Sequence, residues 1–407
     1  MLDFLKNNKF FCKLAGINLL SKVGDRLFYT AMLTIATSLP NGSFAIMIVS
    51  ASETLPILVS LFLGVVADRQ TKKSFHLVNS SLFRMFMYIG IGFIFKYPPT
   101  LLLVIIAAFL NLLSDICGNY STALFSPFSK ILVKKDDMEH AQGLISLGSQ
   151  LITALSTLLG SAILVICTES SLAFINATIF LFVALLYMLI SSTLRAKELN
   201  IQIPAQQKTC CIVKENFKSF CSDHMLLVNL IQLAMLNGFF GGLIPIFALF
   251  INTNNEIPYL SNPIKISILS GIITLSMIIG TSLSTSILRQ TKLYHINIIS
   301  DAMILFIGSA FILNNLLLIF VANGCIAFLL GIVSPRFSAD IVNRYPISRI
   351  GGIITSVNAL LVIIPPITSL LFPLIASINI SSAYIAFIIY AFLLIVISLF
   401  LLKTKNS

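Results

Sequence analysis

The chain has 407 residues, 57% of them hydrophobic and 10% charged, and it carries a formal net charge of +11. Because soluble globular proteins contain about 25% charged residues, this composition excludes an ordinary soluble globule. Apolar segments of about 20 residues recur along the whole sequence, and each is long enough to cross a hydrocarbon core of about 30 Å. The sequence therefore predicts an all-α integral membrane protein. No small-residue cleavage site follows the first ten residues, so we expect no cleavable signal peptide.

We predict twelve transmembrane helices in two pseudo-symmetric six-helix halves. The spans lie near residues 11–37, 43–67, 75–95, 99–121, 143–167, 171–193, 225–251, 264–288, 295–314, 316–335, 350–377 and 381–402. Gly64, near the end of the second span, has a counterpart 216 residues later in Gly280, near the end of the eighth. A parallel repeat of this kind is expected of a transporter built from two similar halves. We therefore divide the chain into an N-terminal half (residues 1–194), a polar linker (195–223) and a C-terminal half (224–407).

Basic residues set the predicted orientation. With the N-terminus in the cytoplasm, 21 of the 26 lysines and arginines fall on the cytoplasmic side, in loops, in the linker or near the termini. This positive-inside bias places both termini and the linker in the cytoplasm. It also explains the net positive charge without an anionic partner, so we do not expect nucleic-acid binding.

The charged hairpin between the second and third spans carries the most specific motif. It reads Gly-x-x-x-Asp-Arg-x-x-basic-basic over residues 64–73. This pattern resembles the signature of the major facilitator superfamily, although Thr71 stands where Gly is usual and Val66 where Leu is common. The resemblance implies the twelve-helix major facilitator fold. It also implies that the loop helps to latch the two halves in one conformation, through Gly64, Asp68, Arg69, Lys72 and Lys73.

Ionisable residues inside the N-terminal spans are the candidates for proton coupling. A charge near the bilayer centre costs roughly 2.5–3.5 kcal/mol on insertion scales, so it should face a partner or a water-filled cavity. Asp25 and Glu53 lie near the middle of the first and second spans, and we expect one of them to bind and release a proton. Their expected charge partners are Lys22, Arg26, Arg84 and Asp115.

The pairing of these charges stays open at this point. Lys22 lies three residues before Asp25 on the same helix face, so the two can form a purely structural pair. Arg26 would then pair with Glu53, and Arg84 could neutralise any of the acids. Asp115 lies near the end of the fourth span, and in the family that the motif resembles an acid at this place often joins the charge cluster of the loop latch.

The C-terminal half carries almost no charge within its spans, apart from Asp301 about six residues into the ninth, which we expect nearer the cytoplasmic rim. Its polar candidates are amides. Helix packing alone would account for them, but they are also the candidate lining of a substrate cavity: Asn229, Gln232, Asn237, Asn323 and Asn358.

No catalytic pattern is found. The sequence has no Walker loop, no metal-spaced His/Cys cluster and no Ser-His-Asp set at one depth. Its seven cysteines are mostly isolated in apolar segments. We therefore predict no enzyme, no metal and no cofactor, and a gradient as the energy source.

Within the superfamily, the sequence is most similar to a bacterial exporter branch. The likeness rests on the Gly24-Asp25 pair of the first span, on Pro127 after the fourth, and on the acidic-basic stretch that leads to Ala141-Gln142-Gly143. It implies proton-linked export of a small amphipathic toxic molecule (an antibiotic, a small peptide antibiotic or a siderophore) from the bacterial cytoplasmic (inner) membrane, with a role in self-immunity or resistance. The expected partners are this substrate, protons and the lipid bilayer, and we expect a monomer. The alternatives are a facilitative or symport carrier for a nutrient or lipid, and a non-transporting sensor.

Overall fold

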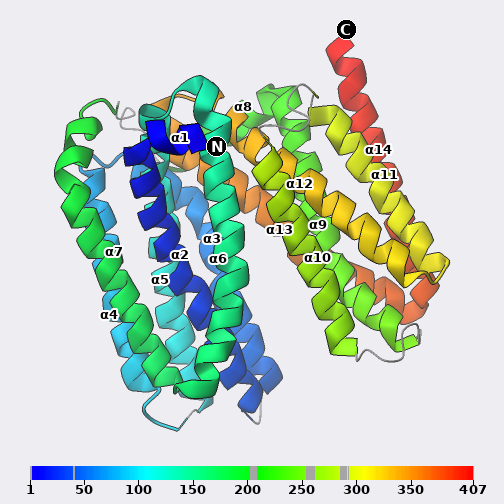
Figure 1. Ribbon diagram of the computed structural model, residues 1–407, viewed down its shortest axis with the longest axis horizontal. Coiled ribbons are helices and arrows are strands. Elements are labelled where there is room, and N and C mark those ends of the chain that lie inside the picture. Colours follow the sequence, from blue (N-terminus) through cyan, green and yellow to red (C-terminus); the bar gives the residue numbers. More distant parts are fainter. Residues whose placement is uncertain are drawn as a thin grey trace. The chain divides into compact units, whose positions relative to one another are not determined.

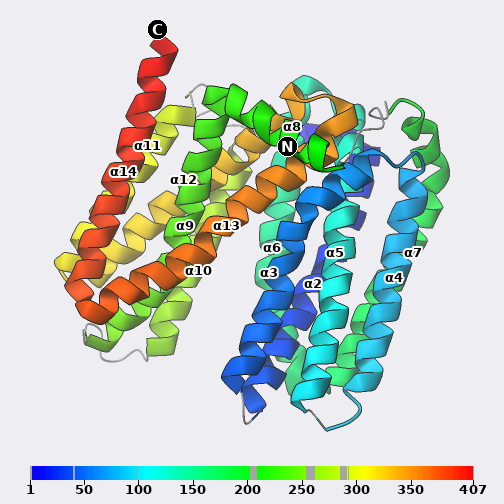
Figure 2. The ribbon, with the colours of Figure 1, turned by 180° about the vertical axis from the view of Figure 1, so that it is seen from behind.

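The computed structural model describes residues 2–39, 42–98, 100–201, 209–253, 262–284, 291 and 293–406, and within these ranges the regular structure is entirely helical. Figures 1 and 2 show the helices from two opposite sides. The first elements in chain order are α1 (Leu2–Asn7), α2 (Lys9–Ser38), α3 (Gly42–Asp68), α4 (Lys73–Ile94), α5 (Leu101–Leu132), η1 (Lys135–Asp137), α6 (Met138–Ile166), α7 (Glu169–Glu198) and α8 (Thr209–Ser222). Those that follow are α9 (His224–Thr253), α10 (Asn262–Leu283), α11 (Leu293–Ile312), α12 (Leu316–Arg344), η2 (Ile347–Arg349), α13 (Ile350–Ile378) and α14 (Ile380–Asn406).

Each predicted span coincides with one long helix, which confirms the all-α membrane fold. In the described part of the chain, nine helices are long and apolar enough to cross a membrane. Two predicted spans end too early, because α5 continues to Leu132 and α12 to Arg344. The predicted end of the eighth span falls at residues 285–290, outside the described residues. Part of the predicted linker is helical, as α8.

The helices cluster into two compact units. Unit 1 contains Met1–Phe217 together with Ile341–Ala359, and unit 2 contains Lys218–Asp340 and Leu360–Ser407. The end of α12 and the start of α13 group with unit 1, and the boundary after Phe217 falls inside the predicted linker. In unit 1, α4 packs along α7, α3 along α5, and α2 along α6; in unit 2, α11 packs along α14. The third and the sixth long helix of each unit therefore pair with each other.

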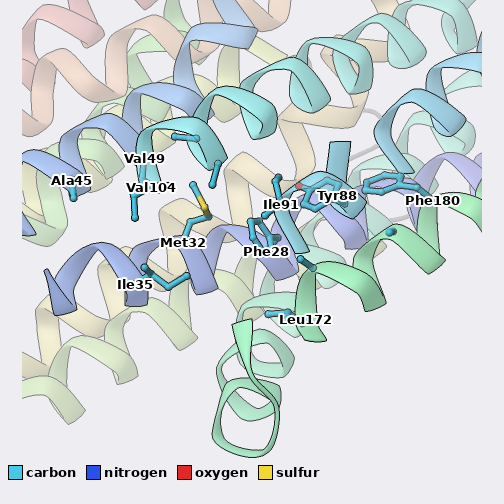
Figure 3. Packing of buried hydrophobic residues seen from close by; sticks show 14 residues of the cluster. Phe28, Met32, Ile35, Ala45, Val49, Tyr88, Ile91, Val104, Leu172 and Phe180 are labelled. Atoms are coloured by element: carbon cyan, nitrogen blue, oxygen red, sulfur yellow. The ribbon is translucent and has the colours of Figure 1, made fainter. Parts of the chain in front are cut away.

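A buried apolar cluster joins α2, α3, α4, α5 and α7 in unit 1 (Figure 3). At one end of it, Tyr88 stacks on Phe180 at 5.3 Å between ring centroids and meets the edge of Phe28 at 5.2 Å. The Tyr88 hydroxyl donates to Asn111 Oδ1 at 2.8 Å, so its polar atom is satisfied inside the bundle. This cluster fixes the helices that carry the intramembrane charges.

Candidate functional site

Arg84 of α4 forms the centre of a charged site in unit 1. Its side chain is 1% exposed, and its guanidinium pairs with the carboxylate of Asp25, which is 23% exposed. The same guanidinium donates to Ser21 Oγ at 2.6 Å and to Ser114 Oγ at 3.2 Å. It also lies 4.0 Å from the ring centroid of Phe180, a cation–π distance. Three neutral contacts therefore hold the arginine in place besides its acid.

Gly24 explains why this arrangement can form next to Asp25. A Cβ at Gly24 would lie 2.6 Å from Asn176 Oδ1 and 2.7 Å from the ring of Phe180. Only glycine lets α7 approach α2 this closely, and Asn176 Nδ2 uses the approach to donate to the Gly24 carbonyl at 2.8 Å. The Gly24-Asp25 pair thus brings Phe180 under the arginine that binds the acid.

The pair lines a polar cavity of about 240 Å³ within unit 1. Most of the lining residues carry charged, amide or hydroxyl groups: Asn18, Ser21, Lys22, Asp25, Ile57, Arg84, Asp115, Gly118, Asn119, Thr122, Ser149, Thr153 and Asn358. Because a charged or hydrogen-bonding wall is expensive inside a membrane, this cavity is the candidate functional site of unit 1.

The other predicted charges are placed as follows. Lys22 donates to Ser149 Oγ of α6 at 2.9 Å, and Arg84 is the basic partner found for Asp25. Asp115 lines the same cavity and accepts from Asn111 Nδ2 at 3.0 Å. Arg26 and Glu53 belong to α2 and α3, but their side chains lie outside the described residues.

The charged hairpin forms a second site, at the N-terminus of α13. The buried carboxylate of Asp68 accepts one hydrogen bond from the backbone N–H of Gly351 at 2.9 Å and another from that of Gly352 at 2.7 Å. The first N–H groups of a helix have no partner within the helix, and the helix dipole favours an anion there. Asp68 therefore caps α13 from the end of α3.

The basic residues of the hairpin differ in role. Lys73 is 1% exposed, and its ammonium donates to the carbonyls of Ala67 at 2.5 Å and Asp68 at 3.1 Å, where it caps the C-terminus of α3. Arg69 is half-buried and Lys72 is exposed. In the same unit, Lys130 of α5 donates to the carbonyl of Val342 at 2.7 Å, near the C-terminal end of α12. No motif in the sequence singles out this lysine.

Gly64 is required by the close approach of α3 and α13. A Cβ there would lie 2.0 Å from Thr355 Oγ1 and 2.7 Å from the Gly351 carbonyl oxygen. We therefore expect Gly64→Ala to lower the free energy of unfolding by about 1–3 kcal/mol, as overpacking does. Gly16→Ala is the control, because a Cβ at Gly16 meets nothing within 4 Å. Thermal unfolding of both variants in one detergent tests this. Equal midpoints would show that α13 moves to make room for the added methyl group at no cost in stability.

The predicted amides of the C-terminal half have different surroundings in the described part of the chain. Asn358 lines the cavity of unit 1. Gln232 is buried against Asp301, while Asn229 Oδ1 accepts from Asn297 Nδ2 at 3.4 Å. Asn323 is fully buried and donates to the Ile319 carbonyl of its own helix, and Asn237 is half-buried. Sequence reasoning missed Ser21, Ser114 and Phe180, because serines and phenylalanines in apolar helices carry no distinctive signal.

Comparison with known proteins places the chain in a family. A family model described as Major Facilitator Superfamily matches residues 14–366. A bacterial homologue of the iron transporter ferroportin, solved in an outward-facing state, has a TM-score of 0.72 at 14% identity, covering 97% of this chain and 99% of that one. The proton:xylose symporter XylE gives 0.66 at 13% identity, covering 98% and 96%.

The human organic anion transporter MFSD10 gives a TM-score of 0.66 at 12% identity, covering 96% of this chain and 99% of that one. No functionally curated protein matches. At these identities the solved structures show the fold alone, whereas the family model covers most of the chain. The chain is a multi-pass membrane transporter, not an enzyme, and it belongs to the Major Facilitator Superfamily.

Proposed function

We propose that the protein is a proton-coupled secondary transporter that exports a small amphipathic toxic molecule from the bacterial cytoplasm. The observation that carries this proposal is the ion pair of Asp25 and Arg84 in the wall of a polar cavity. Ionisable residues in membrane helices mark substrate pathways and proton relays. The candidate substrates remain an antibiotic, a small peptide antibiotic or a siderophore.

The surroundings of the pair suit a carboxylate that changes its charge. When Asp25 binds a proton, it releases Arg84, which still has the hydroxyls of Ser21 and Ser114 and the ring of Phe180 as partners. The guanidinium is then held in position and can attract an anionic or hydrogen-bonding group of the substrate. Asp25 is partly exposed, so a proton can reach it from the cavity. Glu53 stays a second candidate for the same role.

The cavity also indicates how the substrate is held. Its wall combines cationic and anionic groups with amides and hydroxyls, so it favours a molecule that presents a polar face to unit 1. A proton moving down a membrane potential of 100 mV supplies about 2.3 kcal/mol, enough for roughly 50-fold accumulation. One proton per cycle would therefore drive useful export.

A second function fits one of the same observations. Seven of the lining residues are neutral amides or hydroxyls: Asn18, Ser21, Asn119, Thr122, Ser149, Thr153 and Asn358. Such a wall also suits a hydrophilic nutrient, so a facilitative or symport carrier is the alternative. The sign of proton movement separates the two, because an exporter exchanges proton for substrate and a symporter moves both together.

The test uses purified protein in liposomes that contain a pH-sensitive dye. Antibiotics, siderophores and small peptides are added in turn to wild type, Asp25→Asn and Glu169→Gln; Glu169, in the first turn of α7, lies outside the cavity and serves as the matched control. We expect one compound to drive proton counterflow in wild type and in Glu169→Gln, and at least tenfold less in Asp25→Asn. Proton co-movement with a nutrient would instead establish symport, and substrate flux without proton movement would overturn the coupling.

A further inference from the structure

Unit 2 contains a buried carboxylate of its own. Asp301 lies on α11, where it faces α9 and α14, and it is 0% exposed. Gln232 Nε2 of α9 lies 2.7 Å from each of its two oxygens and donates to them. Ser398 of α14 donates its hydroxyl to Asp301 Oδ2 at 2.7 Å. Three helices therefore converge on one acid.

The donors around Asp301 are neutral. Among the described side chains, none of the ion pairs found includes it. The titratable residues of the packed helices are His224 on α9, Tyr384, Tyr390, Lys403 and Lys405 on α14, and Tyr294 and His295 on α11 itself. The Tyr390 hydroxyl donates to the Met235 carbonyl at 2.7 Å, and His295 is exposed six residues before the acid. The side chains of His224, Tyr294, Lys403 and Lys405 lie outside the described residues.

Burial without a cation favours the neutral form of a carboxyl group. A buried ionised carboxylate is strongly disfavoured unless it is paired, whereas hydrogen bonds from neutral donors offset only part of that cost. The site can nevertheless hold both forms. Gln232 Oε1 is buried, and no donor reaches it among the described side chains and backbone groups. Since an amide can turn by 180°, this oxygen can face Asp301 and accept the proton of the neutral acid.

A polar track leads from the acid toward the start of the helices. Asn297 lies one turn before Asp301 on α11, and Asn229 lies one turn before Gln232 on α9. These two amides are linked by a hydrogen bond of 3.4 Å, and Asn229 is half-buried whereas Asn297 is 2% exposed. Water that hydrogen-bonds to these amides would carry the proton to Asp301, since a neutral amide orients water but does not itself take up the proton.

We propose that Asp301, held by Gln232 and Ser398, is a proton-binding site of unit 2 that is loaded and emptied during the transport cycle. The chemical class of the ligand is a proton. A metal cation would need several oxygens turned toward it, but here the Ser398 hydroxyl and the Gln232 amide N–H both point at the carboxylate. That Asp301 has a role in the transport cycle rests on the proposed function. That Asp301 binds and releases a proton does not rest on the cavity in unit 1.

The experiment follows the carbonyl stretching band of protonated carboxyl groups in infrared difference spectra of the purified protein, between about pH 5 and pH 9. We expect one component of this band to titrate in this range in wild type and in Asp340→Asn, the control from α12, and to be missing in Asp301→Asn, while the components of other carboxyl groups remain. Ser398→Ala removes a hydrogen-bond donor to the Asp301 anion, so the titration midpoint of Asp301 in this variant should rise by about one pH unit. This milder variant carries the test if Asp301→Asn does not fold.

Two results would overturn the proposal. The first is a spectrum that is the same in wild type and Asp301→Asn over the whole pH range, with a Ser398→Ala titration equal to that of wild type. The second is a titration midpoint that moves when sodium replaces choline as the only salt cation, which would identify a metal-cation site instead. The spectra need no substrate. The proposal for Asp301 can therefore be overturned while substrate-driven proton counterflow is observed, and proton binding at Asp301 can be observed while counterflow is absent.

Discussion

Replacing Asp25 with leucine is expected to destabilise the protein more than replacing Arg84 with leucine. In Asp25→Leu, a guanidinium that is 1% exposed loses its carboxylate and stays inside the bundle. Removing one partner of a buried ion pair typically costs about 3–5 kcal/mol. In Arg84→Leu, the remaining carboxylate is 23% exposed and borders the polar cavity, where water can solvate it. We therefore expect a smaller loss, of about 1–3 kcal/mol.

The double variant Asp25→Leu/Arg84→Leu decides whether the ion pair causes this difference. Replacing both partners removes the uncompensated charge, so we expect it to be more stable than Asp25→Leu alone. Unfolding free energies in one detergent, with Glu169→Leu as the acid control outside the cavity, give the coupling energy. Losses that simply add in the double variant would show that Arg84 is held by Ser21, Ser114 and Phe180 rather than by the acid.

The sequence predicted the helices well because membrane spans are governed by length and hydropathy. It placed Asp25 and Arg84 among the interacting charges but could not choose between Lys22 and Arg84 as the partner of Asp25. Spacing along one helix favours Lys22, three residues away, whereas the observed pair joins α2 to α4. Such a choice depends on how helices rotate against each other, and in unit 1 that rotation follows from Gly24 and the aromatic contacts of Phe180.

The repeat offset relates the buried charges of the two units. Adding the 216-residue offset of Gly64 and Gly280 to Arg84 leads to Ser300, next to Asp301. Arg84 and Asp301 therefore lie buried at nearly the same level of the third long helix of their units, one a base and the other an acid. By contrast, the contact of Asp68 with Gly351 and Gly352 joins residues more than 280 positions apart, and no local pattern predicts it.

Asp68→Asn is expected to release the N-terminus of α13 with almost no change in side-chain volume. Each carboxylate oxygen accepts one backbone N–H, from Gly351 or from Gly352. An asparagine keeps one acceptor and turns an NH₂ group toward the other N–H, in a site where the side chain is 4% exposed. Losing one charge-assisted bond and leaving one donor unpaired weakens the contact by about 2 kcal/mol, so the two glycine amides should exchange hydrogen roughly 30-fold faster.

This substitution tests the latch directly, because hydrogen exchange reports the contact and transport reports its use. We propose that the bonds of Asp68 to α13 must break and re-form in each cycle, as the conformational latch that the hairpin motif implies. Faster exchange in peptides covering residues 341–359, together with altered transport, would support the latch, and the exposed Asp136 provides Asp136→Asn as control. Lost transport with unchanged exchange would contradict it, because the carboxylate would then act on the cycle without holding α13. Faster exchange with normal transport would reduce Asp68 to a helix cap whose release does not limit the cycle.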